Sequence, residues 1–133
     1  MPSEEAQLPT KTVISVVDDD PSAREGTADL INSMGFAAVA FPSAEEFLEL
    51  DGSRATSCVI SDMRMPGMTG LELYCRLRKS GQPVPMILVT AFPNERDRRR
   101  ALRAGVICYL AKPFNDRELL DCVHSALESR GVG

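Results

Sequence analysis

Side chains that could bind or attack a phosphate follow four apolar runs of the chain. Asp18 and Asp19 come directly after residues 13–17, and Asp62 ends the run 58–62. Thr90 ends the run 85–90, and Lys112 follows residues 106–110. Short apolar runs of this kind, bounded by Gly, Pro and charged residues, predict buried strands. Because ligands of open α/β sheets bind at the carboxyl ends of the strands, we expect these side chains to converge at one edge.

Three carboxylates in one pocket raise one another's pKa unless a cation is present. Mg²⁺ prefers oxygen ligands, and Asp19 and Asp62, with a water held by Asp18, suit it. A carboxylate whose charge is screened in this way can attack phosphorus and form an acyl phosphate. Lys112 and the hydroxyl of Thr90 could then hold the phosphoryl oxygens. Each residue alone has a plainer interpretation, a helix cap for an Asp or a loop for Lys-Pro, but the set favours a phosphate and metal site.

Five strand-helix units must position these residues. The strands are expected at residues 13–17, 36–41, 58–62, 85–90 and 106–110. Capping patterns predict that helices begin after Asp20, Ser43, Thr69, Asn94 and Asn115. Parallel strands need such crossover connections, which are almost always right-handed. The expected fold class is α/β, a doubly wound parallel sheet covered on both faces.

Length and composition limit the alternatives. A chain of 133 residues with net charge -4 predicts one domain without a general nucleic-acid surface. No apolar run reaches the length of a membrane span, and the acidic N-terminus lacks the regions of a signal peptide, so we expect a cytoplasmic protein. The four cysteines lack metal-ligand spacing and are expected as buried free thiols, at Cys58, Cys75, Cys108 and Cys122.

Four motifs together resemble the receiver domain of two-component response regulators: residues 16–20 (VVDDD), 61–70 (SDMRMPGMTG), 90–91 (TA) and 112–114 (KPF). The resemblance covers residues 11–128, with a flexible arm over 1–10 and a tail over 129–133. It implies a five-stranded, flavodoxin-like sheet of strand order 2-1-3-4-5.

The resemblance also implies roles for the clustered residues. Asp62 would accept a phosphoryl group from the phosphohistidine of a sensor histidine kinase. Asp19, Asp62 and the backbone carbonyl of Arg64 would bind Mg²⁺, and Asp18 would hold one of its waters. Lys112 would pair with the phosphate.

Phosphorylation would then change the surface. The resemblance implies that Thr90 turns toward the phosphoryl oxygen and that Tyr109 follows inward. The surface formed by the fourth helix, fifth strand and fifth helix would change as a result. A cis peptide bond is expected before Pro113. The chain would not turn over outside substrates as an enzyme does.

Two further features bear on rates and partners. Arg64 and Phe92, two residues after Asp62 and Thr90, are expected to modulate the rates: Phe92 shields the acyl phosphate and Arg64 interacts with the incoming phosphate. The fourth helix is rich in arginine, which is typical of a solvated helix face. Its arginines could instead meet acidic residues of a second copy in a phosphorylation-dependent homodimer; the acidic candidates are Asp116, Glu118 and Asp121.

Three alternatives stay open. Within the family, the details resemble FixJ-type receivers, so the chain is a free-standing receiver or the excised regulatory domain of a DNA-binding transcription factor. A Mg-dependent aspartyl-phosphate phosphatase is a reading from another class, but such enzymes carry a second acid where this chain has Arg64. A nucleotide-binding Rossmann domain lacks its Gly-x-Gly-x-x-Gly motif after the first strand.

Overall fold

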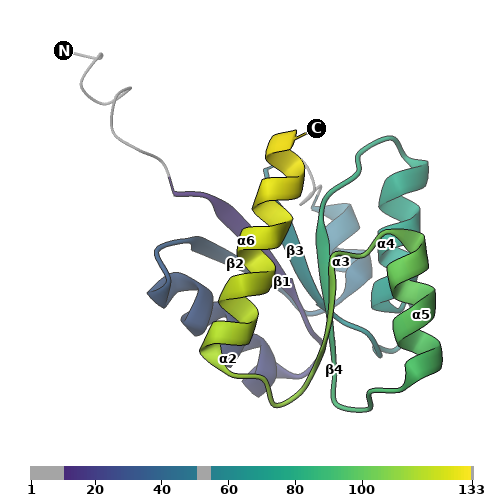
Figure 1. Cartoon of the computed structure of the whole chain (residues 1–133), viewed down its shortest axis with the longest axis horizontal. Helices are drawn as coiled ribbons and strands as arrows, with labels where there is room; N and C mark the ends of the chain where they lie inside the picture. The colour runs from purple at the N-terminus through teal and green to yellow at the C-terminus, as the bar shows by residue number, and fades with distance from the viewer. Residues whose placement is uncertain (1–10, 51–54, 133) are drawn as a thin grey trace.

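The computed structural model describes residues 11–50 and 55–132 (Figure 1). Five strands form one parallel sheet of order β2-β1-β3-β4-β5. They are β1 (Val13–Val17), β2 (Ala37–Phe41), β3 (Cys58–Asp62), β4 (Met86–Thr90) and β5 (Cys108–Ala111). The expected fold class and strand order are therefore confirmed. The expected N-terminal arm, 1–10, lies outside the described residues.

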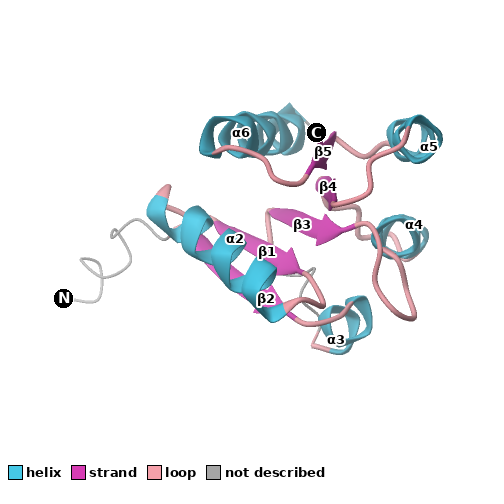
Figure 2. Ribbon diagram, turned by 90° about the horizontal axis from the view of Figure 1, so that it is seen from below, coloured by secondary structure: helices cyan, strands magenta, loops and turns pink. Residues whose placement is uncertain are grey.

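Helices cover both faces of the sheet. They are α2 (Pro21–Ser33), α3 (Ala44–Glu49), α4 (Gly70–Lys79), α5 (Glu95–Ala104) and α6 (Asp116–Val132). Figure 2 shows α2 and α6 on one face and α3, α4 and α5 on the other. The expected fourth and fifth helices are α5 and α6, and α6 includes residues 129–132 of the expected tail. None of the described helices is long and apolar enough to cross a membrane.

Local hydrogen bonds explain where the helices begin. The side chain of Asp20 accepts a bond from the first turn of α2 at 2.9 Å, and Pro21 follows as its first residue. Thr69 and Glu72 form a reciprocal capping box at α4, with bonds of 2.8 and 3.1 Å. Ser43 accepts a bond from the third residue of α3 at 3.0 Å. These short polar side chains satisfy N–H groups that have no partner inside a helix.

Strand β5 begins two residues later than expected. The backbone N–H of Val106 donates to the carbonyl of Ala101 at 3.1 Å, so this residue closes the end of α5. Gly105 precedes it with a φ of 111°, a conformation that favours glycine. The apolar run 106–110 therefore contains both a helix end and the start of a strand, which its composition does not separate.

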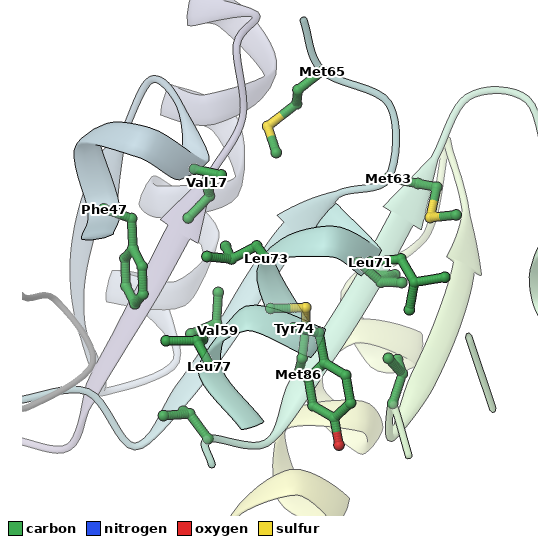
Figure 3. Close-up of a cluster of buried hydrophobic side chains, with 14 of the residues drawn as sticks. Val17, Phe47, Val59, Met63, Met65, Leu71, Leu73, Tyr74, Leu77 and Met86 are labelled. Carbon is green, nitrogen blue, oxygen red and sulfur yellow. The ribbon is translucent and has the colours of Figure 1, made fainter. Parts of the chain in front are cut away.

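The core lies in two layers, one on each side of the sheet. Figure 3 shows the layer beneath α3 and α4, which includes Val17, Phe47, Val59, Leu73 and Met86. The opposite layer joins the sheet to α2 and α6 through Ile14, Ile31, Ile60, Leu119 and Val123. Neighbouring residues of one strand enter opposite layers, as expected for strands buried on both faces. This packing fixes the strand ends on which the polar side chains stand.

The expectation that all four cysteines are buried is wrong for Cys75. Cys58 and Cys122 are buried and Cys108 is partly buried, but Cys75 is exposed. Helix α4 packs on the sheet through Leu71, Tyr74 and Leu77, and Cys75 lies one position beyond that face. It lines a surface groove of about 660 Å³ between α4 and α5.

Candidate functional site

Three carboxylates meet at the carboxyl edge of the sheet. Strands β1 and β3 are paired in parallel with Val17 opposite Ser61, so the next residues, Asp18 and Asp62, emerge side by side. One oxygen from each of Asp18, Asp19 and Asp62 lies within 4.8 Å of the others. Asp18 is 2% exposed, Asp62 is partly buried and Asp19 is exposed to solvent. The sequence prediction that these acids converge is confirmed.

Asp18 is the most restrained of the three. Its carboxylate accepts a hydrogen bond from the backbone N–H of Asp20 at 3.0 Å and another from the Nζ of Lys112 at 3.0 Å. The guanidinium of Arg24 donates to the backbone carbonyl of Asp18 at 2.8 Å. The sequence analysis did not predict this role of Arg24. The only sequence feature that could have indicated it is the position of Arg24 in the first turn of a helix that follows three acidic residues.

Lys112 lies directly after β5 and bridges two of the acids. Its Nζ lies 3.0 Å from a carboxylate oxygen of Asp18 and 3.7 Å from one of Asp62. The peptide bond between Lys112 and Pro113 is cis, as expected. A buried carboxylate needs such a counter-ion, because an unpaired charge in the interior is strongly unfavourable.

Opposing effects act on the carboxyl group of Asp62. Burial raises its pKa above the usual value, Lys112 lowers it, and the charges of Asp18 and Asp19 raise it again. A backbone hydrogen bond from Arg64 also lowers the pKa. The net direction is upward, which means that this pocket disfavours the charged form of Asp62 when no further cation is present.

The donor set fits Mg²⁺. The cluster offers carboxylate oxygens, the hard ligands that this ion takes, and among the described residues it includes no cysteine or histidine. Asp19 and Asp62 are open enough to coordinate directly, whereas Asp18 is already occupied by two hydrogen bonds. The division between direct ligands and a residue that acts through water stays a prediction.

Thr90 and Tyr109 lie on neighbouring strands but have different partners. Thr90 is buried, and its Oγ1 accepts a hydrogen bond from the backbone N–H of Phe92 at 3.0 Å. The hydroxyl of Tyr109 accepts one from the backbone N–H of Asn94 at 3.3 Å, at the beginning of α5. Tyr109 thus stands against the β4–α5 loop, among residues that line a separate surface pocket with Asn94.

Arg64 and Phe92 are in contact at the surface. The guanidinium of Arg64 lies 5.8 Å from the centroid of the Phe92 ring, and Phe92 as a residue is 68% exposed. The same guanidinium lies 3.5 Å from a carboxylate oxygen of Asp97 in α5. Asp97 was missed by the sequence analysis, because it lies 33 residues from Arg64 and no local pattern joins the two.

Comparison with known proteins identifies the family. The model of the response regulator receiver domain matches residues 14–124. Nodulation protein W of Bradyrhizobium diazoefficiens is 39% identical over 119 residues, which are 90% of this chain and 52% of that protein. Transcriptional regulatory protein FixJ of the same organism is 34% identical over 120 residues, 90% of this chain and 58% of FixJ. The chain thus spans about half the length of these curated relatives.

A solved structure agrees in both sequence and fold. A response regulator receiver protein from Burkholderia phymatum is 40% identical, with a TM-score of 0.77, over 89% of this chain and 96% of that one. The matched region contains every strand end that carries the carboxylate cluster, Thr90 and Lys112. The chain therefore belongs to the response regulator receiver domain family of two-component signalling.

Proposed function

We propose that Asp62 accepts a phosphoryl group from the phosphohistidine of a sensor histidine kinase and that this change alters the α5-β5-α6 surface. The observation that carries the proposal is the position of Asp62 between a lysine ammonium and two further carboxylates. Its side chain is 13% exposed, so a donor can reach it from solvent. Receiver domains are signalling proteins. In this proposal the chain acts as a cytoplasmic switch and does not turn over outside substrates.

The transfer itself needs positioning and charge neutralisation more than covalent help. A carboxylate oxygen of Asp62 bonds to phosphorus as the bond from phosphorus to the histidine nitrogen breaks, and that nitrogen takes up a proton. The ammonium of Lys112, 3.7 Å from Asp62, is placed to pair with a phosphoryl oxygen. Mg²⁺ held by Asp19, Asp62 and the Arg64 carbonyl would neutralise charge on the phosphoryl oxygens.

Thr90 and Tyr109 would carry the signal outward. A phosphoryl group on Asp62 would add hydrogen-bond acceptors near the carboxyl end of β4, and the hydroxyl of Thr90 would turn toward them. Turning would weaken its bond with the N–H of Phe92, at 3.0 Å, and so loosen the loop that holds Tyr109. If this loop has two conformations and phosphorylation favours one of them, the surface formed by α5, β5 and α6 would change.

A homodimer is one readout that this surface could support. The arginines of α5 are exposed, and three of them pair at 3.2 to 3.9 Å with acids of their own helix: Arg98, Arg99 and Arg100. Asp116, Glu118 and Asp121 of α6 in a second copy supply opposite charge. Sedimentation velocity across concentration, with and without phosphorylation, tests this; identical behaviour of both forms contradicts it.

A second candidate function is that of the regulatory domain within a DNA-binding transcription factor. The observation in its favour is that relatives named as transcriptional regulators are about twice as long as the matched region. The receiver itself, with net charge -4, is not expected to bind DNA directly. Reading the gene beyond Gly133 decides between a free-standing receiver and this alternative, by the presence or absence of a helix-turn-helix domain.

The chemistry can be tested by intact mass. The chain is incubated with acetyl phosphate and Mg²⁺, next to Asp62→Asn, and both are repeated after addition of a chelator. We expect one phosphoryl adduct that requires both Asp62 and Mg²⁺. An adduct of equal yield on Asp62→Asn refutes the assignment, and steady release of phosphate from unrelated monoesters would instead support a phosphatase.

A further inference from the structure

Three side chains from three segments meet at the surface between the loops that follow β3 and β4. Arg64 comes from the β3–α4 loop, Phe92 from the β4–α5 loop and Asp97 from the first turn of α5. The guanidinium of Arg64 lies 5.8 Å from the Phe92 ring centroid and 3.5 Å from the Asp97 carboxylate. A cation that contacts a ring face and a carboxylate at once is held in place by both.

Both loops are tied to the site by their backbones. The backbone of Arg64 interacts with the Asp62 carboxyl group and lowers its pKa. The backbone N–H of Phe92 donates to the Oγ1 of Thr90 at 3.0 Å. A contact between the side chains of Arg64 and Phe92 therefore spans the two loops that border the phosphoacceptor.

Asp97 is built to keep its position. Its side chain is 16% exposed, whereas that of Arg64 is 56% exposed. Its backbone N–H donates to the Oδ1 of Asn94 at 2.8 Å, and its carboxylate accepts from the Nδ2 of Asn94 at 2.9 Å. Arg100 adds a longer contact of 3.9 Å. The fixed partner is thus the carboxylate, and the mobile one is the long side chain of Arg64.

We propose that Asp97 is a positioning residue that holds the Arg64 guanidinium over Phe92, and that an incoming phosphoryl group competes with Asp97 for it. While Asp97 holds Arg64, the side chains of Arg64 and Phe92 stay together between the loops that follow β3 and β4. A phosphoryl anion attracts the guanidinium away from Asp97, which breaks a direct tie between the β3–α4 loop and α5. The inference rests on the proposed function and extends it to a residue outside the carboxylate cluster.

The competition has a structural consequence for the switch. Asp97 is bonded to Asn94, whose backbone N–H donates to the hydroxyl of Tyr109 at 3.3 Å. Release of Arg64 therefore leaves the Asp97 carboxylate without this cation, and Asp97 is linked to Tyr109 through Asn94. Linkage requires the reverse effect as well: a contact that holds Arg64 on Asp97 disfavours phosphorylation by the same factor.

The test compares rates of adduct formation, by intact mass with acetyl phosphate and Mg²⁺, for wild type, Asp97→Asn, Arg64→Ala and the double variant. Asp97→Asn keeps an acceptor for Asn94 and removes only the charge. We expect it to accelerate phosphorylation by about two- to fivefold, the range that a partly exposed ion pair supports. The same change in the Arg64→Ala background should have no effect, because its target is absent.

Glu95→Gln is the matched control. It removes an acid from the same first turn of α5, so it copies the loss of charge and of helix-dipole interaction, but Glu95 pairs with Arg98 and Arg99 instead of Arg64. We expect wild-type rates for it. An unchanged rate for Asp97→Asn, or an equal acceleration with and without Arg64, overturns the proposal.

A second readout needs neither phosphate nor metal. The chain has no tryptophan, so Phe92→Trp places a single tryptophan beneath Arg64, and its emission can be excited apart from that of the two tyrosines. If Asp97 holds Arg64 over the ring, adding Asp97→Asn raises the rate of quenching by acrylamide, whereas adding Glu95→Gln does not. Equal quenching rates in Phe92→Trp alone, with Asp97→Asn and with Glu95→Gln overturn the positioning role of Asp97. Absence of any adduct on wild type refutes the proposed function, while the quenching result still stands or falls independently.

Discussion

Adding one methyl group at Gly70 should displace the end of the strand that carries Asp62. Gly70 is the first residue of α4, and its backbone N–H donates to the carbonyl of Met63 at 3.1 Å. A Cβ at this position would lie 2.7 Å from Cδ2 of Leu88 and 2.9 Å from Oγ of Ser61, and would also meet the backbone carbonyl of Asp62. Since two of these neighbours belong to the end of β3, relief requires the strand that carries Asp62 to move.

The expected cost of Gly70→Ala follows from overpacking. Forcing a methyl group into a filled interior typically costs about 1 to 3 kcal/mol. For a chain of this length, each kcal/mol corresponds to roughly 3 to 4 °C in the melting temperature. We therefore expect a fall of about 4 to 11 °C, together with slower phosphorylation because the Asp62 carboxylate leaves its position beside Lys112.

Gly26→Ala provides the matched control, with the opposite sign. Gly26 lies exposed within α2, and a Cβ there meets nothing within 4 Å. Alanine in a helix interior is more stable than glycine by about 0.5 to 1 kcal/mol, so this variant should unfold later than wild type. Urea denaturation and adduct formation are measured for both variants. A Gly70→Ala protein that is as stable as wild type refutes the argument that the added methyl group has no room. A Gly26→Ala protein that is destabilised as much as Gly70→Ala refutes it as well.

Two further predictions concern the cap and the counter-ion. Thr69→Ala removes the capping box with Glu72 and should cost about 1 kcal/mol in urea denaturation; no loss would show that the 3.1 Å bond contributes nothing. Lys112→Met removes the counter-ion of Asp18 and should lower the free energy of unfolding, measured in the presence of chelator, by about 2 kcal/mol. This is below the usual cost of breaking a buried pair, because Lys112 is partly exposed. Lys79→Met, at an exposed position, is its control, and equal losses in both would contradict this account.

The fold and the centre of the site could be predicted because their signals are local. An apolar run followed by an acid, as at Asp18 and Asp62, identifies both a buried strand and its functional end. The Asp20-Pro21 pair shows where α2 begins, because side-chain capping and the fixed φ of proline act within a few residues. Parallel topology then brings the strand ends together without further information.

Contacts between distant segments could not be predicted in the same way. The pair of Arg64 with Asp97 depends on how α5 packs beside the β3–α4 loop, and neither residue carries a signal for the other. Cys75 was expected to be buried because it follows apolar neighbours, yet burial in α4 depends on the rotation of the helix about its axis. Such rotation is set by packing across the sheet, and the broad apolar stripe of a helix does not define which residues at its border are buried.

Charge explains why the effects of phosphorylation should concentrate at one side of the molecule. Before transfer, Lys112 lies closer to Asp18, at 3.0 Å, than to Asp62, at 3.7 Å. A phosphorylated Asp62 carries up to about two negative charges in place of the one on its free carboxylate, so it would attract both Lys112 and the guanidinium of Arg64. Lys112 follows β5, and Arg64 is tied to α5 through Asp97. Movement of Lys112 would act on β5, and release of Arg64 from Asp97 would act on α5, so the effects should concentrate at the α5-β5 edge.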